Sequence, residues 1–454
     1  MKRSAWRYLW VAPDIRRKLL ITAGILILYR LTAQIPVPGA DREVIAAVMA
    51  GTSPGVGFLQ LLNFLSGGTV ANFSVLAMGV YPYITAQIIL QILAPIVPQI
   101  KQKMEEDPRE GQKWMERWSY LLSVPIAALQ AIGQIRLFTF FSGGIPVIKN
   151  FGFSGATLLP SIAVILSMTA GTMFAIWLGQ IISEYGLRRQ GLSLIIFAGI
   201  VAQLPQNFYQ LIGNPGLDAL TRGLYLAIAL IVLVVTIFLI VVVYQGRRHI
   251  PVMYPSQRVG RRMSLPVKGS LPLPVNMAGM IPLIFANSLL ALPGVVAGFF
   301  LTSQNEALSN LAIGLQRAFD PGQSGFYWLA YFIMVVLFTF FYTEVLFLQQ
   351  NYGEQLRRAG ARIPGVLPGD PTQRYLMRVL RRITLPGALF LGFVAVLPYL
   401  LNLAVPAASQ GGFSALMLMS SSGLIIVVGV VRDMMYHIEA ELKMHGYQES
   451  LLVR

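Results

Sequence analysis

Ten apolar runs divide this chain, and their length constrains the fold more than any other feature. Each is close to the roughly 20 residues that an α-helix needs to cross the hydrocarbon core of a bilayer. Only 12% of the 454 residues are charged and 55% are hydrophobic, too apolar a balance for a water-facing fold. The sequence therefore predicts an all-α polytopic membrane protein. The ten runs cover 19–35, 74–96, 119–138, 158–183, 192–212, 222–244, 275–299, 326–350, 382–401 and 414–434.

Basic residues set the predicted orientation, because Lys and Arg accumulate in short cytoplasmic loops. Of the 35 Lys and Arg residues, 29 lie before residue 19, in every second connection or in the tail. We therefore expect both termini to be cytoplasmic, which an even number of spans requires. The six exceptions are Arg30, Arg42, Arg136, Lys149, Arg222 and Arg317.

Two of the predicted cytoplasmic connections, 245–274 and 351–381, are longer than topology requires and are rich in arginine. Topology and anionic lipid headgroups explain part of the net charge of +16. The excess in these loops predicts a docking surface for an acidic partner, either a protein or RNA. The candidate docking residues are Arg247, Arg248, Arg258, Arg261, Arg262, Arg357, Arg358 and Arg362.

Two similar stretches lie in the second span of each set of five spans. They read GVYPYITAQ at 79–87 and GMIPLIFAN at 279–287. Because each set holds an odd number of spans, the halves 1–212 and 213–454 are expected to have opposite orientations in the membrane. Inverted halves are typical of proteins that pass cargo between two half-bundles.

The two stretches carry prolines and amides at corresponding positions. Pro82 and Pro282 each remove a backbone hydrogen bond, so we expect two kinked helices that face each other across the interface of the halves. Unpaired amides are costly in hydrocarbon, so one interpretation of the polar side chains is ordinary bonding between helices. The other is a polar seam that can open. The candidate seam residues are Gln87, Gln91, Asn287 and Ser288.

A short apolar segment at about 58–72 precedes the second span on the predicted external side. It is too short to cross the bilayer and ends in Gly67 and Gly68, which give it a hinge. Two interpretations remain open: a re-entrant plug that folds back into the protein, and a helix that lies in the membrane interface.

The sequence holds no usable pattern for catalysis or metal binding. The three histidines lack ligand spacing, cysteine is absent, and no Gly-rich loop with Lys could hold a nucleotide phosphate. Glu344 is the one acidic residue well inside a span, whereas proton-coupled transport relies on buried acidic residues. We expect no enzyme activity, no cofactor and no metal, with energy supplied by a partner.

Three classes of function remain compatible with these observations. In a channel for polypeptides, the aliphatic side chains of Val80 and Ile84, one turn apart, would belong to a hydrophobic constriction rather than to ordinary packing. A secondary transporter with inverted repeats would need a polar solute site at the midplane and no long basic loops. An insertase or scaffold would have no through-pore.

Seven long motifs resemble the SecY family of protein-conducting channel subunits, in order and spacing, and the similarity covers nearly the whole chain. It implies ten transmembrane helices in two inverted five-helix halves around an hourglass pore, in a bacterial cytoplasmic membrane. The motifs are MGVYPYITAQII, GTMFAIWLGQIISEYG, GLSLIIFAGIVAQLP, RRHIPVMYPSQRVGRR, LPVNMAGMIPLIFANSLL, RIPGVLPGDPT and LIIVVGVVRDMMYHIEAELKMHGYQES.

The resemblance also implies roles for particular residues. A plug at about 58–72, with its hinge at Ser66, Gly67 and Gly68, would close the pore from outside. The second and seventh helices, with Pro82, Pro282 and the seam residues, would form a lateral gate through which signal sequences and membrane segments reach lipid. The family's pore-ring positions fall on Val80, Ile84, Leu192, Ile196, Ile284 and Ile426.

The partners that the resemblance implies are SecE-like and SecG-like small membrane subunits, and the SecA motor or the ribosome on the basic loops. Signal sequences and nascent polypeptides would be the cargo. One departure concerns the motor, because the family's IPGIRPG carries an arginine and this chain reads IPGVLPG with Leu367 in that place. The channel function is therefore better supported than its pairing with SecA.

Overall fold

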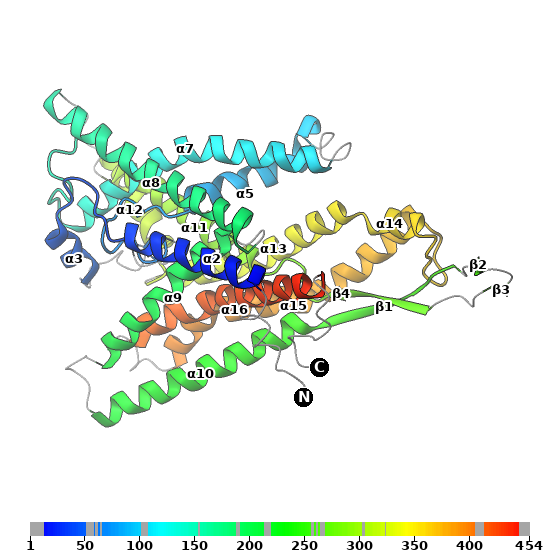
Figure 1. Ribbon diagram of the computed structural model, residues 1–454. Coiled ribbons are helices and arrows are strands. Elements are labelled where there is room, and N and C mark those ends of the chain that lie inside the picture. The colour runs from blue at the N-terminus through cyan, green and yellow to red at the C-terminus, as the bar shows by residue number, and fades with distance from the viewer. Residues whose placement is uncertain are drawn as a thin grey trace.

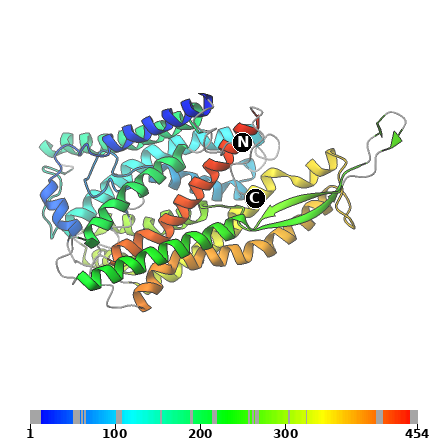
Figure 2. The same cartoon turned by 60° about the horizontal axis from the view of Figure 1, so that its bottom comes forward.

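The computed structural model is a bundle of long helices from which a β-hairpin projects at one end (Figures 1 and 2). The structure describes residues 13–50, 59, 62–63, 66–100, 108–152, 155–187, 191–212, 219–255, 258–259, 262–263, 268–301, 305–322, 324–404 and 413–444.

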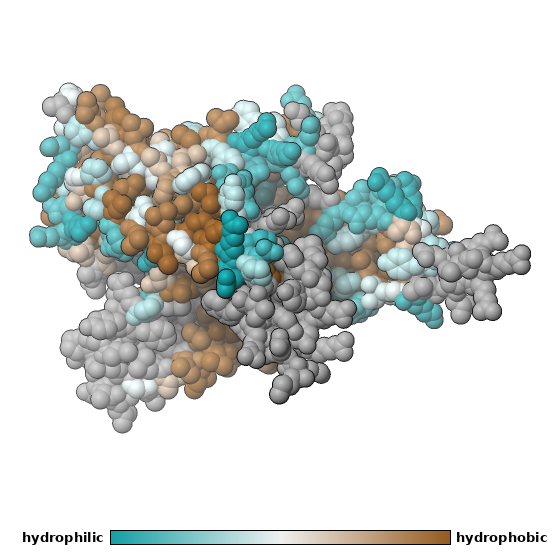
Figure 3. All heavy atoms as spheres, in the orientation of Figure 1, coloured by the Kyte–Doolittle hydropathy of each residue, from teal (hydrophilic) through white to brown (hydrophobic). Residues whose placement is uncertain are grey.

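Ten helices coincide with the ten predicted spans, which confirms the polytopic helical fold. Among the described residues, stretches of α7, α8, α11, α13 and α15 are long and apolar enough to cross a membrane, and shorter apolar helices lie within α5, α9 and α10. Figure 3 shows hydrophobic side chains gathered over the middle of the bundle, and hydrophilic ones around α14 at one end and α3 at the other. The ten helices are α2 (Pro13–Thr32), α5 (Tyr81–Ile96), α7 (Pro108–Phe141), α8 (Leu158–Tyr185), α9 (Gly191–Ile212), α10 (Ala219–Gln245), α11 (Ile281–Phe300), α13 (Gly325–Gln350), α15 (Asp370–Ala404) and α16 (Phe413–Met444).

Shorter elements connect these helices. The connection 245–274 is not helical but forms a hairpin of β1 and β4, in which Ile250 and Val252 alternate with exposed residues as a strand with one buried face requires. A two-residue pair, β2 with β3, lies further out along the same connection. The remaining elements are α3 (Arg42–Ala50), η1 (Gly155–Thr157), α12 (Glu306–Ala318), α14 (Tyr352–Arg358), β1 (Arg247–Met253), β2 (Arg258–Val259), β3 (Arg262–Met263) and β4 (Lys268–Pro274).

The expected kinks at Pro82 and Pro282 are wrong, because each proline lies in the first turn of its helix and not in the helix interior. Helix α5 begins at Tyr81 and α11 at Ile281, so each proline occupies the second helical position. The first turn of a helix has no intrahelical partner for its N–H groups, so proline costs nothing there. The residues before them, 74–80 and 275–280, form turns instead of the predicted membrane helix.

Packing places these two helices together at the core of the bundle. Helix α5 packs on α7 and on α11, while α11 also packs on α13. On the other side, α16 contacts α9, α10 and α15. Side chains from the starts of α5 and α11, together with α9 and α16, therefore share one large hydrophobic cluster.

Candidate functional site

The six aliphatic residues of the predicted pore ring share this large hydrophobic cluster. They come from four places in the chain: the start of α5, the first turns of α9, the start of α11 and the middle of α16. Four are buried with exposed fractions of 2–8%, and the two from α9 are half-buried against the cluster. The structure therefore brings together side chains that are up to 346 positions apart. The buried four are Val80, Ile84, Ile284 and Ile426, and the two from α9 are Leu192 and Ile196.

Most described residues of the segment predicted as a plug are buried within the protein, whereas Asn72 at its end is exposed. Leu59, Leu62 and Val70 are at most 6% exposed, and the ring of Phe73 packs edge-on against Phe138 of α7 at 5.2 Å between centroids. Burial among helices favours the re-entrant segment over a helix in the membrane interface. Residues 58, 60, 61, 64 and 65 of the predicted plug lie outside the described residues.

The predicted plug hinge is a tight turn of three small residues. Gly67 and Gly68 have φ angles of +76° and +86°, a left-handed conformation that only glycine adopts without strain. The hydroxyl of Ser66 donates to the carbonyl of Asn63 at 3.0 Å, which ties the turn to the plug segment. A methyl group on Gly79 would lie only 3.1 Å from the Ser66 Cα atom. The turn thus packs directly on the residue that precedes Val80 of the ring.

The predicted gate helices α5 and α11 are joined by a hydrogen bond that the sequence did not reveal. The hydroxyl of Tyr81 donates to the carbonyl of Ser288 at 2.7 Å, and both residues are buried. Gln87 instead donates to Tyr83 of its own helix at 3.1 Å. Asn287 is buried at 2% exposure. The described bond between α5 and α11 is therefore made by Tyr81, more than one helical turn before Gln87, which was the expected seam residue.

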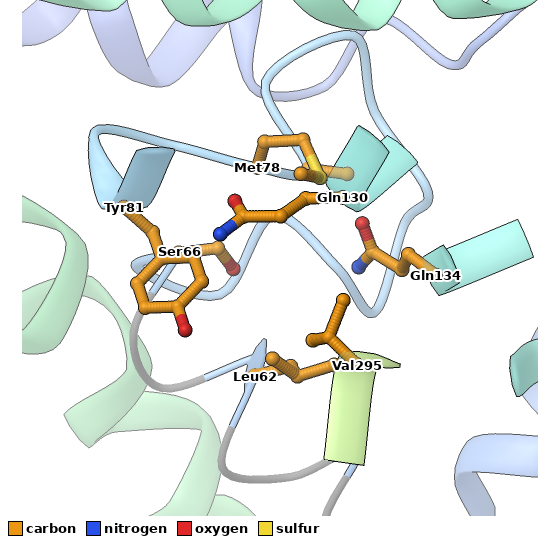
Figure 4. Close-up of a pocket in the computed structure, with 8 residues that line it drawn as sticks. Leu62, Ser66, Met78, Tyr81, Gln130, Gln134 and Val295 are labelled. Carbon is orange, nitrogen blue, oxygen red and sulfur yellow. The ribbon is translucent and has the colours of Figure 1, made fainter. Parts of the chain in front are cut away.

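A small cavity of about 20 Å³ lies between the plug turn, α5, α7 and α11 (Figure 4). Gln130 and Gln134 of α7 contribute amide groups to its lining, beside Ser66 and Tyr81. Both amide atoms of Gln130 and the carbonyl oxygen of Gln134 are buried with no hydrogen-bond partner among the described residues. A cavity of this size has room for about one water molecule. Gln91 of α5 likewise has a buried carbonyl oxygen with no partner in the described part of the chain.

Sequence reasoning overlooked Gln130 and Gln134, although both were visible as amides inside the apolar run 119–138. Their period of four places them on one face of α7. The predicted seam involves only the second and seventh spans, whereas α7, the third span, also packs on both α5 and α11. Three helices, not two, therefore surround the polar groups next to the plug.

The two basic connections fold together into one unit, which we call the basic module: the β1–β4 hairpin, α14 and the first turns of α15. Met253 and Arg362 exchange two backbone hydrogen bonds of 2.8 and 2.9 Å, which joins the two connections. The module projects from the bundle (Figures 1 and 2) and packs around a separate hydrophobic cluster, to which Phe347 near the end of α13 also contributes. The cluster residues are Ile250, Val252, Leu273, Phe347, Leu356, Ala361, Ile363, Leu376 and Leu380.

Three of the candidate docking arginines already have partners within the protein. Arg357 and Arg358 form ion pairs with Glu354 at 2.8 and 3.0 Å. Hydrogen bonds from these two arginines lower the pKa of Glu354, so its carboxylate stays ionised and offsets part of their charge. Arg247 donates to the hydroxyl of Tyr436 in α16 at 2.6 Å.

Of the five remaining candidate docking arginines, the structure describes the side chains of two and only the backbone of two others. Arg248 and Arg362 are exposed, and the structure gives their side chains no ionic partner among the described residues. Arg258 and Arg262 lie on the outer strand pair β2–β3, where only the backbone is described. Arg261 lies outside the described residues. Leu367, in the place of the family arginine, is 74% exposed.

Metal-binding chemistry finds no support in the described part of the chain. No group of three or more His, Cys, Asp or Glu side chains is close enough there to hold an ion. The residues predicted for the pore ring, plug hinge and gate are aliphatic residues, glycines, prolines, amides and Ser66 and Ser288, and none of them is ionisable in the physiological range.

Comparisons with known proteins agree with this arrangement. The family model described as SecY matches residues 74–435. The chain is 32% identical to the protein translocase subunit SecY of Streptomyces griseus over 99% of both chains. Its fold resembles a solved structure of a protein-conducting channel, with a TM-score of 0.60 at 17% identity over 96% of this chain and 93% of that one. It also resembles Sec61 in the canine ribosome-channel complex from the endoplasmic reticulum, with a TM-score of 0.57 at 16% identity over 96% and 93% of the two chains. This chain, with its ten helices and its converging aliphatic residues, belongs to the SecY family.

Proposed function

We propose that this chain is the channel subunit of a protein translocase, which conducts unfolded preproteins across the membrane and releases transmembrane segments sideways into lipid. The observation that carries the proposal is the convergence of six aliphatic residues from four distant places, with the plug turn packed on Gly79 beside them. A dry aliphatic constriction blocks ions because they cannot shed their hydration there. It yields to a polypeptide because its side chains make no specific bonds that must be broken.

The plug at 58–72 would close this constriction at rest. Its buried residues and the glycine turn at Gly67 and Gly68 support a segment that sits inside the protein and can swing at a defined point. A polypeptide entering the ring would displace the turn from Gly79, where the two segments are in van der Waals contact.

The lateral gate would lie between α5 and α11. A single bond such as that from Tyr81 to Ser288 contributes only about 1 kcal/mol in a membrane, so the seam can part. A signal helix that partitions into lipid would stabilise the open state by its own differential affinity. The other proposed gate residues are Gln87, Gln91 and Asn287 on these helices, with Pro82 and Pro282 at the helix starts.

The two halves, 1–212 and 213–454, would be inverted units that move apart when the gate opens, around an hourglass pore. The bias of Lys and Arg supports cytoplasmic termini and a cytoplasmic position for the basic module, in the cytoplasmic membrane of a bacterium. Small SecE-like and SecG-like subunits would complete the channel.

The basic module would receive the partner that supplies energy, either a SecA-like motor or the ribosome. Clustered guanidinium groups present forked donors to carboxylates and phosphates. Arg248 and Arg362 are expected to contribute most among the described arginines, because Glu354 offsets the charge of Arg357 and Arg358. Charge reversal at Arg248 and Arg362, or at Arg261 and Arg262, should therefore weaken binding in a salt-dependent way.

Binding of ribosomes and of SecA to the reconstituted channel tests this assignment. Reversal of Arg357 and Arg358 to Glu, with Glu354→Gln to avoid a local acidic cluster, provides the matched control and should weaken binding less. Undiminished binding of both partners to the Arg248 and Arg362 variants at physiological salt would show that these arginines serve topology alone.

The channel proposal itself is tested at the ring. Changing Ile84, Ile196, Ile284 and Ile426 together to Ser should wet the constriction and make planar bilayers conduct ions, whereas the same four changed to Val should keep the seal. Equal conductance of the two variants, at the wild-type level, would exclude the ring as the seal. A secondary transporter would in that case be the better interpretation, and uptake of a labelled solute would be its assay.

A further inference from the structure

We propose that Arg30 and Gly199 form a clamp that holds the plug turn closed, with Arg30 acting as a positioning residue for gating. The inference rests on the proposed plug function and adds to it the residues that determine how easily the plug leaves. Arg30 lies on α2 and Gly199 on α9, so the turn is held from two helices of the N-terminal half.

The first side of the clamp is a hydrogen bond from a charged arginine of the first predicted span, on α2, to the plug turn. The Nη1 atom of Arg30 donates to the carbonyl of Gly67 at 3.0 Å, and the Arg30 side chain is half-buried. An arginine within a span is costly unless it faces the protein interior and finds acceptors. Here the acceptor is a backbone carbonyl at the hinge of the plug, and a bond from a charged donor is stronger than a neutral one.

The neighbouring residue Tyr29 reinforces the same contact. Its hydroxyl lies 3.4 Å from the carbonyl of Ser66, and the ring is 1% exposed. Two successive residues of α2 therefore donate hydrogen bonds to two successive carbonyls of the turn. Glycine at 67 makes this possible, because its left-handed backbone turns the carbonyl toward the helix.

The second side of the clamp is a contact between two glycines. A methyl group on Gly199 would lie 2.4 Å from the Cα atom of Gly67, and a methyl group on Gly67 would lie 2.8 Å from the Cα atom of Gly199. Both distances are shorter than any carbon–carbon contact that packing allows. The turn can therefore sit against α9 only while both positions lack a side chain. The side chain of Gln203, one turn along α9, lies against Gly68, since a methyl group there would be 2.8 Å from its Nε2 atom.

These contacts form a latch and not a permanent bond. They are made to backbone atoms of a turn, so no side chain of the turn has to be extracted when the plug moves. When the turn leaves, the guanidinium of Arg30 faces the opened passage, where water can solvate its charge. A few contacts thus favour the closed state, and hydration of Arg30 compensates part of their loss on opening. The free-energy difference between the closed and open states therefore stays small enough for a substrate to shift it.

Three variants test the clamp in planar bilayers without substrate. Arg30→Met keeps an unbranched stem but removes the guanidinium donor, and Gly199→Ala removes the space for the turn. Each should raise the resting open probability by about tenfold or more, the scale of one hydrogen bond from a charged group. Arg30→Lys keeps a charged donor and should restore part of the closure. Gly24→Ala on α2 is the matched control, because a methyl group there meets no atom within 4 Å.

A second measurement separates loss of the clamp from loss of the fold. The chain has no cysteine, so Val70→Cys provides a single buried thiol in the plug segment. In the Arg30→Met and Gly199→Ala backgrounds, a membrane-impermeant thiol reagent should label it faster, with no change in the Gly24→Ala background. Wild-type open probability and wild-type labelling in both variants would overturn the clamp. If the ring variants conduct in the same bilayers, the channel proposal would stand without it; if they also remain closed, the channel proposal itself has failed.

Discussion

The turns before α5 and α11 share a sequence pattern and a backbone shape but differ in what supports them. Gly79 and Gly279 have φ angles of +52° and +67°, and each is followed by a proline at the second helical position. Gly79 packs against the backbone of Ser66 in the plug turn. A methyl group on Gly279 would enter open space, with the nearest atom 4.0 Å away in the side chain of Arg432.

The second turn is instead held by its own side chain. Asn276, 3% exposed, accepts a hydrogen bond from the Gly279 N–H at 2.9 Å and donates to the Gly279 carbonyl at 3.1 Å. The turn before α5 is supported from outside instead, because Ser66 of the plug turn packs against Gly79. The segment proposed as the plug therefore supports the turn before α5, whereas the turn before α11 is held by its own side chain.

The largest expected difference comes from alanine at the two glycines. Gly79→Ala combines a left-handed alanine with crowding against Ser66 and should destabilise the closed protein by about 3 kcal/mol. Gly279→Ala carries only the backbone strain and should cost about 1 kcal/mol. Thermal unfolding of the purified protein in detergent measures both. Equal effects would mean that the plug does not support the first turn.

Removing the side-chain support of the second turn should have the next largest effect. Asn276→Ala leaves a buried N–H and a buried carbonyl of Gly279 without their partner, which costs about 2 kcal/mol. Asn276→Asp keeps the acceptor but places a buried carboxylate oxygen against the Gly279 carbonyl, so it should cost at least as much. Plug labelling through Val70→Cys should be unchanged in both variants. A rise in labelling would show that the two turns are coupled after all.

The smallest expected effect is at the bond that joins the two gate helices. Tyr81→Phe removes the contact with the Ser288 carbonyl and should ease parting of α5 and α11 by about 1 kcal/mol. Insertion of a marginally apolar segment into lipid should rise by several-fold, measured by protease protection in proteoliposomes. Tyr83→Phe is the control, because the bonds described for its hydroxyl are to Gln87 within α5 and to Tyr120 of α7, not to α11. The same gain in both variants would place the seam elsewhere.

The bounds of α8, α9, α10 and α13 were predictable within about three residues, whereas the starts of α5 and α11 were not. An apolar run followed by proline fits both a kinked helix and a helix that begins there. The helices begin near the prolines because Gly79 and Gly279 adopt left-handed backbone conformations. Glycine permits this conformation, but packing decides whether it is adopted. The extension of α7 and α15 beyond the apolar runs was also missed, because polar residues continue a helix outside the membrane without any hydrophobic signal.

The sequence by itself determined that this chain crosses a membrane with ten helices, that its basic loops are unusually long, and which family it resembles. These properties depend on the transfer energy of each segment between water and lipid, which its own side chains set. Only the tertiary structure decided that Arg30 binds Gly67, that Gly199 touches the plug turn and that Tyr81 joins Ser288. Each of these contacts is made to backbone atoms. Since every residue has the same backbone, the sequence does not show which backbone group a side chain will contact.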